Sequence, residues 1–169
     1  MANRINGFSV AGAVGFADGV DASIVTSTEQ IVDSIFIPGG TFRAGDVILI
    51  QAALIRSSTG TGAFTNRIYW NETNDIITSP TSLGVSSGSV NDEYVPIYRN
   101  VCIVSNISTI VNNTGSSLET DLGDNSGNEG GSAISTITSI NWDLDGYIIV
   151  AGQYSTSTTI TKKFLTIIK

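Results

Sequence analysis

A chain of 169 residues is long enough for one domain with its own core, and 41% of its residues are hydrophobic whereas only 14% are charged. The net charge of −7 argues against nucleic acid as a partner, because phosphate binding needs clustered cations. Histidine is absent and cysteine occurs once, which excludes an intrachain disulfide and a Cys/His nucleophile or zinc site.

The N-terminal residues 1–20 are rich in Gly and Ala and have little amphipathic pattern. They lack the features of a signal peptide, and no run in the chain approaches the length of a transmembrane span, so we expect no membrane insertion. These residues could form a first strand or an arm that orders against a neighbouring subunit. We divide the chain into an arm or attachment segment at 1–20 and a β-sandwich domain at 21–169.

Two strands are expected on either side of Ser27–Glu29, and Pro38-Gly39-Gly40 closes the second. After a turn at Ala44-Gly45-Asp46, residues 47–57 give the longest strand signal in the chain. One face of this strand carries Val47, Leu49, Gln51, Ala53 and Ile55, and the other carries Ile48, Ile50, Ala52 and Leu54. Because both faces are largely apolar, we expect a central strand covered on each side, by the opposing sheet and by another subunit.

The middle of the chain alternates between loops of small polar residues and short strands. We expect a loop at 57–65, a strand at 67–72 and a second loop at 79–92. Next comes a strand whose Pro96 indicates an edge position or a bulge. Strands at 100–105 and 108–112 follow, the first of which contains Cys102, expected to pack as a small apolar residue.

The last third begins with a polar segment at 115–132 and continues with three expected strands, at 134–142, 146–155 and 158–168. The whole chain then holds eight to ten short strands at 8–15-residue spacing, and no window shows a sustained helical period. The predicted fold class is all-β: a two-sheet antiparallel β-sandwich with a short N-terminal arm. A jelly roll is the topology expected for this length.

Pairs of carboxylates are the catalytic groups that the composition leaves open, as in glycoside hydrolysis. One pair is Asp143 with Asp145 and the other is Asp92 with Glu93. Asp145-Gly146 stands where a hairpin turn belongs, and Asp before Gly is favoured there for backbone reasons alone. We therefore interpret the first pair as turn residues and expect no enzyme.

Oxygen ligands gather in the acidic segment that contains Asp121, Asp124, Asn125 and Glu129. Such a loop could hold Ca²⁺, but it does not fit the helix-flanked calcium-loop pattern, because Glu129 stands where that pattern needs Gly. A solvated loop available for surface contacts is the preferred interpretation, and no cofactor is predicted.

Aromatic residues could stack on sugar rings, but alternating strand positions favour core or interface anchors. The residues expected at a subunit interface are Val47, Leu49, Ile55, Tyr69, Trp70 and Trp142.

Three segments carry a resemblance to a known group of proteins: GGTFRAGDVILIQAALIRSSTGTGAFTNRIYWNETN, YVPIYRNVCIV and SINWDLDGYIIVAGQ. They resemble small structural proteins of tailed bacteriophages, in which an apolar strand ends in Arg, a Gly/Thr-rich loop follows and an R-I-Y-W-N strand comes next. The resemblance covers about residues 35 to 168. It implies a trimeric jelly-roll head, similar in outline to tumour-necrosis-factor-like and C1q-like domains, as in capsid decoration proteins, head fibres and tail fibres.

The resemblance implies a virion protein made in the bacterial cytoplasm, with itself and other virion proteins such as the major capsid protein as partners. We expect a homotrimeric capsid decoration or head-fibre protein that stabilises the shell or displays binding loops. One alternative is a tail adhesin whose loops at 57–65 and 115–132 bind bacterial surface glycans. Another is a glycoside-active or carbohydrate-binding module that uses Asp143 and Asp145.

Overall fold

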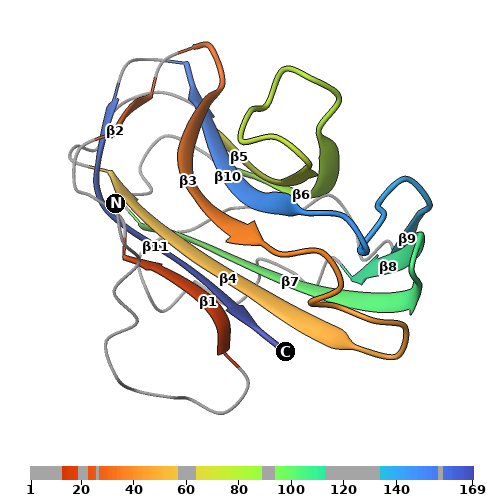
Figure 1. Ribbon diagram of the computed structural model, residues 1–169. Coiled ribbons are helices and arrows are strands. Elements are labelled where there is room, and N and C mark those ends of the chain that lie inside the picture. Colours follow the sequence, from red (N-terminus) through yellow and green to blue (C-terminus); the bar gives the residue numbers. More distant parts are fainter. Residues whose placement is uncertain are drawn as a thin grey trace.

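The computed structural model describes residues 13–18, 23–25, 27–56, 64–88, 94–112, 134–155 and 158–169. Within these ranges the chain forms eleven strands, arranged as two antiparallel sheets that face each other (Figure 1). The described ranges contain no helix, and so none that could cross a membrane. The predicted all-β class and two-sheet sandwich are confirmed.

The larger sheet has seven described strands, in the order β1-β11-β4-β7-β8-β9, with β2 also paired to β11. Their bounds are β1 (Ala13–Asp18), β2 (Ser23–Val25), β4 (Val47–Arg56), β7 (Tyr94–Ser105), β8 (Ser108–Asn112), β9 (Ile134–Ile137) and β11 (Thr158–Ile168). The expected central position of the long strand is confirmed, because β4 pairs with β11 on one edge and with β7 on the other.

The smaller sheet has four strands in the order β3-β10-β5-β6. Their bounds are β3 (Gln30–Ile37), β5 (Phe64–Asn71), β6 (Thr81–Gly88) and β10 (Gly146–Tyr154). Among the described strands the chain therefore changes sheet six times: between β2 and β3, β3 and β4, β4 and β5, β6 and β7, β9 and β10, and β10 and β11. Such alternation places residues that are distant in sequence on opposite walls of one core.

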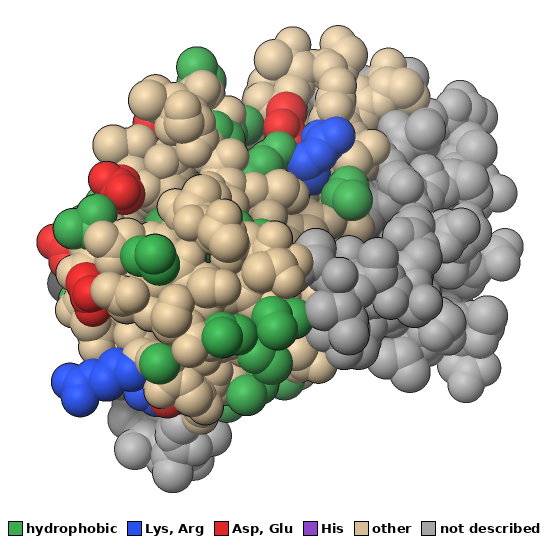
Figure 2. Space-filling model, turned by 90° about the vertical axis from the view of Figure 1, so that its right-hand side faces the viewer, with side chains coloured by type: hydrophobic (Ala, Val, Ile, Leu, Met, Phe, Trp, Pro, Cys, Tyr) green, Lys and Arg blue, Asp and Glu red, His purple; other side chains and the backbone are tan. Residues whose placement is uncertain are grey.

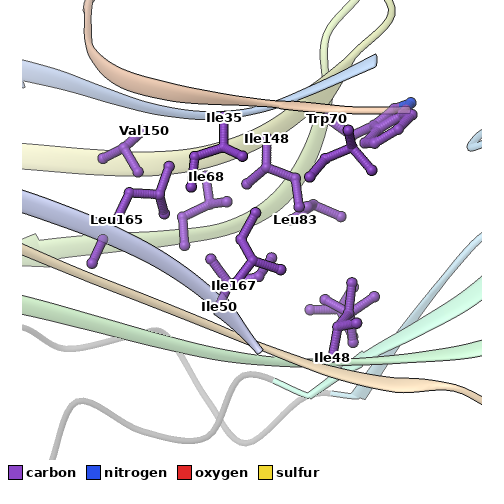
Figure 3. Close-up of a cluster of buried hydrophobic side chains, with 14 of the residues drawn as sticks. Ile35, Ile48, Ile50, Ile68, Trp70, Leu83, Ile148, Val150, Leu165 and Ile167 are labelled. Atoms are coloured by element: carbon purple, nitrogen blue, oxygen red, sulfur yellow. The ribbon is translucent and has the colours of Figure 1, made fainter. Parts of the chain in front are cut away.

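The core fills the space between the two sheets (Figure 3). From β4 it takes Ile48, Ile50, Ala52 and Leu54, all at most 1% exposed. These are the residues that alternation assigns to one face of β4, and they meet Ile68, Ile148 and Val150 of the smaller sheet in the same cluster. β-branched side chains suit this pleated surface because their χ1 is restricted.

An aromatic group closes the core at the end where the chain crosses between sheets. The ring of Trp142 lies 4.6 Å from that of Trp70 and 5.3 Å from that of Phe42, centroid to centroid. The indole N–H of Trp142 donates to the Thr109 hydroxyl over 2.7 Å, and both residues are buried. Trp142 thereby connects β8 to the segment that leads into β10.

The two predicted turns before β4 are present. In the first turn Thr41 N donates to Pro38 O, and in the second Asp46 N donates to Arg43 O. Each turn has a glycine with positive φ at its third position, Gly40 (73°) and Gly45 (94°). That position needs φ above zero in a type II turn, which glycine adopts without steric cost.

Some of the expected element boundaries are wrong. The loop predicted at 79–92 contains strand β6, because an edge strand needs only one ladder, here with β5, and its Leu83 is buried in the core. The strand predicted at 134–142 ends at Ile137, because the chain must turn there to change sheets. Residues 13–18 form β1, which pairs with β11, so this part of 1–20 is a first strand, one of the two alternatives that the sequence left open. The division of the chain at residue 20 stays a prediction.

Pro96 lies on a stretch of β7 that pairs with β4 opposite Ala53, whereas the ladder from β7 to β8 covers only Asn100–Ser105. Among the described strands Pro96 therefore has a neighbour on one side only, as expected for a residue without an N–H.

Candidate functional site

The two carboxylates of the WDLDGY segment connect loops. Asp145 Oδ1 accepts a hydrogen bond from Gly39 N over 2.8 Å, and Asp143 Oδ2 accepts one from Asn106 Nδ2 over 3.0 Å. A Cβ added at Gly39 would lie 2.3 Å from the carbonyl oxygen of Asp143, so the two loops pack at a distance that only glycine permits. These contacts agree with the interpretation of both Asp residues as turn residues.

The described residues contain no group of three or more Cys, Asp and Glu side chains that could hold a metal ion. Asp121, Asp124, Asn125 and Glu129 lie outside the described residues, as do Asp92 and Glu93 and the loop at 57–63. The predictions about the acidic segment and about the adhesin loops therefore stay predictions.

The outward side of the larger sheet carries a row of apolar side chains, which we call the outer apolar face: Val47, Leu49, Cys102, Val104, Ile110 and Ile168. Val47 is 56% exposed and Val104 is 54% exposed, whereas the other four are half-buried. The register places them together, since Val47 pairs with Cys102, Cys102 with Ile110, and Leu49 with Ile168. Side chains at paired positions of neighbouring strands point to the same side of the sheet.

Figure 2 looks onto the end of the sandwich where β8 and β9 lie. The largest group of exposed hydrophobic side chains in this view is in the lower half, where β1 and most of β4 and β7 of the larger sheet lie in Figure 1. Single exposed hydrophobic residues are ordinary on a protein surface, but several that share one face indicate a contact surface.

The predicted interface residues fall in three places. Val47 and Leu49 are on the outer apolar face, and Ile55 continues their alternation along β4, although its side chain is outside the described residues. Tyr69 is buried on the outward side of the smaller sheet, against Ile149.

Trp70 is 3% exposed and Trp142 is 1% exposed, and both belong to the core between the sheets. The expectation that they contact another subunit is corrected, because side chains buried inside their own chain leave almost no surface for a partner. The sequence left core and interface both open for these two residues, since each position offers a large aromatic ring among strand residues.

Sequence reasoning missed the part of the outer apolar face that β7, β8 and β11 contribute. Cys102 is half-buried on that face beside Val47, and Ile110 follows on the next strand. The signal was available in the alternation within VCIV (101–104) and STIV (108–111). Val101, Ile103 and Val111 point inward and are buried. Cys102, Val104 and Ile110 alternate with them and point outward.

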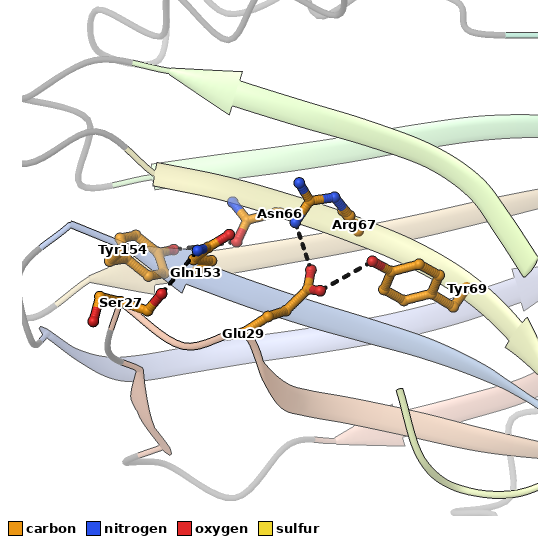
Figure 4. Close-up of polar contacts among 7 residues, drawn as sticks. All are labelled: Ser27, Glu29, Asn66, Arg67, Tyr69, Gln153 and Tyr154. Carbon is orange, nitrogen blue, oxygen red and sulfur yellow. Dashed lines mark hydrogen bonds and ion pairs between the residues drawn. The ribbon is translucent and has the colours of Figure 1, made fainter. Parts of the chain in front are cut away.

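A polar cluster lies on the outward side of the smaller sheet (Figure 4). The Glu29 carboxylate pairs with Arg67 over 2.8 Å and accepts a hydrogen bond from the Tyr69 hydroxyl over 3.0 Å. Burial of the phenol, together with the hydrogen bond to Glu29, raises the pKa of Tyr69 to about 12. Gln153 Nε2 also donates to Ser27 O, so the segment before β3 is held onto β5 and β10.

The loop between β5 and β6, residues 72–80, is held by two side chains. Asn71 Nδ2 donates to the carbonyl oxygens of Asp75 and Thr78, and Asp75 Oδ1 accepts hydrogen bonds from Ile77 N and Thr78 N. Hydrogen bonds from the Thr73 hydroxyl and then from these amides lower the pKa of Asp75 to about 2. The loop has a defined shape although it is short of buried apolar residues.

Comparisons with protein-family models, with curated proteins and with solved structures gave no match to this chain.

Proposed function

We propose that the chain is a structural component of a bacteriophage virion, a homotrimeric capsid decoration or head-fibre protein. The proposal joins the resemblance of residues 35–168 to phage structural proteins with one structural observation, the outer apolar face. Virion location and trimeric state come from the resemblance, and the apolar face supplies a surface on which subunits could associate.

Burial of this face would be favourable. Val47 and Val104 each keep more than half of their surface in water, and covering it would stabilise an assembly by about 1 kcal/mol for each side chain. A closed homotrimer repeats each contact three times, so the stabilisation from a small patch on one chain is multiplied by three in the assembly.

We further propose that the sandwich is a jelly roll. The strand orders β1-β11-β4-β7 and β3-β10-β5-β6 support this topology, since the chain repeatedly changes sheet and the late strands β10 and β11 lie between earlier ones. A hairpin-like addition of β8 and β9 extends the larger sheet beyond β7.

The contacts of three described carboxylates, Asp143, Asp145 and Glu29, support a structural role for these groups over a catalytic one. Asp143 and Asp145 accept hydrogen bonds from neighbouring loops, and Glu29 pairs with Arg67. Each of these groups has a role in holding the fold together, as the proposal requires.

The interface is tested by placing charge on the outer apolar face. We expect Val47→Asp combined with Val104→Asp to convert the trimer to monomers, because six buried carboxylates in a trimer cannot be paired. Val85→Asp, at a valine that is 39% exposed on the smaller sheet, is the matched control and should stay trimeric. Sedimentation velocity measures both, and an unchanged sedimentation coefficient in the double variant would show that subunits associate elsewhere.

The virion role is tested with purified particles of the virus that encodes the chain. Immunogold electron microscopy with antibody against the folded protein should label particles at regular positions on the head. Particles without label, and without peptides of this chain in mass spectrometry, would contradict a virion role.

A further inference from the structure

A pocket of about 290 Å³ opens between the β5–β6 loop and the segment that follows β9. Its lining includes Trp70, Glu72, Thr78, Thr81 and Ser139, which come from three separate parts of the chain. The hydroxyls of Thr81 and Ser139 lie 3.4 Å apart and bring the β6 side of the pocket to the segment after β9. The pocket is outside the outer apolar face, so an assembly through that face does not use it.

Hydrogen bonds hold the side of this pocket that the β5–β6 loop forms. The β5–β6 loop is held by the Asn71 and Asp75 hydrogen bonds described above. Ser79 in the lining adopts φ of 54° directly before Pro80, a left-handed conformation that is uncommon for a residue with a Cβ. Non-glycine residues in such conformations concentrate at ligand sites, where the surrounding structure maintains them.

We propose that this pocket binds one neutral sugar residue of a glycan. Hydroxyl groups from Thr78, Thr81 and Ser139 can donate and accept, which suits a ligand that presents several hydroxyls of its own. Among the described lining residues the Glu72 carboxylate is the one charged group, and it can accept hydrogen bonds from two neighbouring sugar hydroxyls. Because the described part of the lining includes no Lys or Arg, an anionic ligand would meet the negative charge of Glu72 without a compensating cation there.

The size of the pocket sets the size of the ligand. Its volume of about 290 Å³ is just below the range usual for small-molecule sites, about 300–1,000 Å³. One sugar ring fits that space, and the rest of a glycan would extend into solvent.

Trp70 contributes the edge of its indole ring. Trp142 packs against one side of the ring, and a Cβ at Gly146 would lie 2.4 Å from Trp70 Cζ2, so strand β10 closes on it as well. Figure 3 shows the indole nitrogen at the end of the ring turned away from Leu83 and Ile148. Because the ring is 3% exposed, it lines the pocket with a small part of its edge and offers no free face for stacking.

The test is saturation-transfer difference NMR on the full chain with a panel of probes: the methyl glycosides of glucose, galactose and N-acetylglucosamine, the anionic N-acetylneuraminic acid and the cationic glucosamine. We expect signal from at least one neutral glycoside. Ser139→Tyr, which fills the mouth of the pocket, should abolish it, and Glu72→Ala should weaken affinity at least tenfold. Ser155→Tyr, at an exposed position beyond the other end of β10, is the matched control and should bind normally.

Three results would overturn the proposal: no signal from any neutral glycoside at tens of millimolar, signal that Ser139→Tyr leaves unchanged, or binding confined to the charged probes. Ser139 and Glu72 are both outside the core, and circular dichroism checks that both variants fold. The sugar site does not depend on the virion role, because its test uses the isolated chain and is read separately from oligomeric mass.

Discussion

Trp142→Phe is the substitution that tests the core most sharply. The indole is 1% exposed and its N–H donates to Thr109 Oγ1, which is also fully buried. Phenylalanine removes part of the ring from a packed site, at a cost of about 2 kcal/mol. It also leaves the Thr109 hydroxyl without this donor, at a further cost of about 1–3 kcal/mol. The expected loss of unfolding free energy is therefore about 3–5 kcal/mol.

A double-mutant cycle separates the two contributions. Thr109→Val alone leaves the indole N–H without its acceptor, so it should cost about 2 kcal/mol. In the Trp142→Phe background the same change should cost about 1–2 kcal/mol less, because the hydrogen bond is already gone. Urea unfolding followed by circular dichroism, at one fixed protein concentration, gives all four free energies.

The control is Leu144→Ala, which removes a side chain that is 42% exposed in the same turn and should change stability by about 0.5 kcal/mol or less. A loss below about 1 kcal/mol for Trp142→Phe would refute the placement of Trp142 in the core. Strict additivity with Thr109→Val would refute the hydrogen bond between the two side chains. A Trp142→Phe chain of normal stability but altered oligomeric mass would instead favour an interface role.

Three further predictions concern the smaller sheet and its loop. Gly146→Ala should destabilise the protein by about 1–3 kcal/mol in urea unfolding, because its Cβ would overlap the Trp70 ring; a neutral change would contradict that packing. The raised pKa of Tyr69 means that the folded state keeps the phenol proton more tightly than the unfolded chain does. The contribution of the protonated phenol to the free energy of unfolding is complete below pH 10 and is lost as the pH approaches 12. Tyr69→Phe should therefore remove this part of the loss of stability at alkaline pH, together with the late step in tyrosinate absorbance. The lowered pKa of Asp75 gives the opposite pH dependence. The contribution of the ionised carboxylate to the free energy of unfolding is present above pH 3.8 and is lost as the pH falls toward 2. An NMR titration of the Asp75 carboxyl with a midpoint near 4 would disprove the loop hydrogen bonds.

The sequence predicted the architecture well where alternation was strict. Ile48, Ile50, Ala52 and Leu54 were assigned to one face of β4 by their spacing alone, and all four are buried. The two glycine turns before β4 were also predicted from the sequence, because each needs a positive φ that few other residues adopt.

The failures have physical causes that a single sequence does not display. Strand β6 is rich in Ser and Gly, and it forms because β5 offers an unpaired edge, which is a tertiary effect. Trp142 lies in a turn, although the sequence around it predicts a strand, because the chain crosses from one sheet to the other there. The sugar pocket had no sequence signal, because Thr81 and Ser139 are 58 residues apart and meet only in the fold.

The central claim is that the chain is a subunit of a symmetric trimer associated through the outer apolar face. Multi-angle light scattering of the unmodified chain, at concentrations from below one to several hundred micromolar, tests it most directly. A single species of three times the 17.7 kDa chain mass is the result we predict. A species of 17.7 kDa at every concentration would contradict the claim.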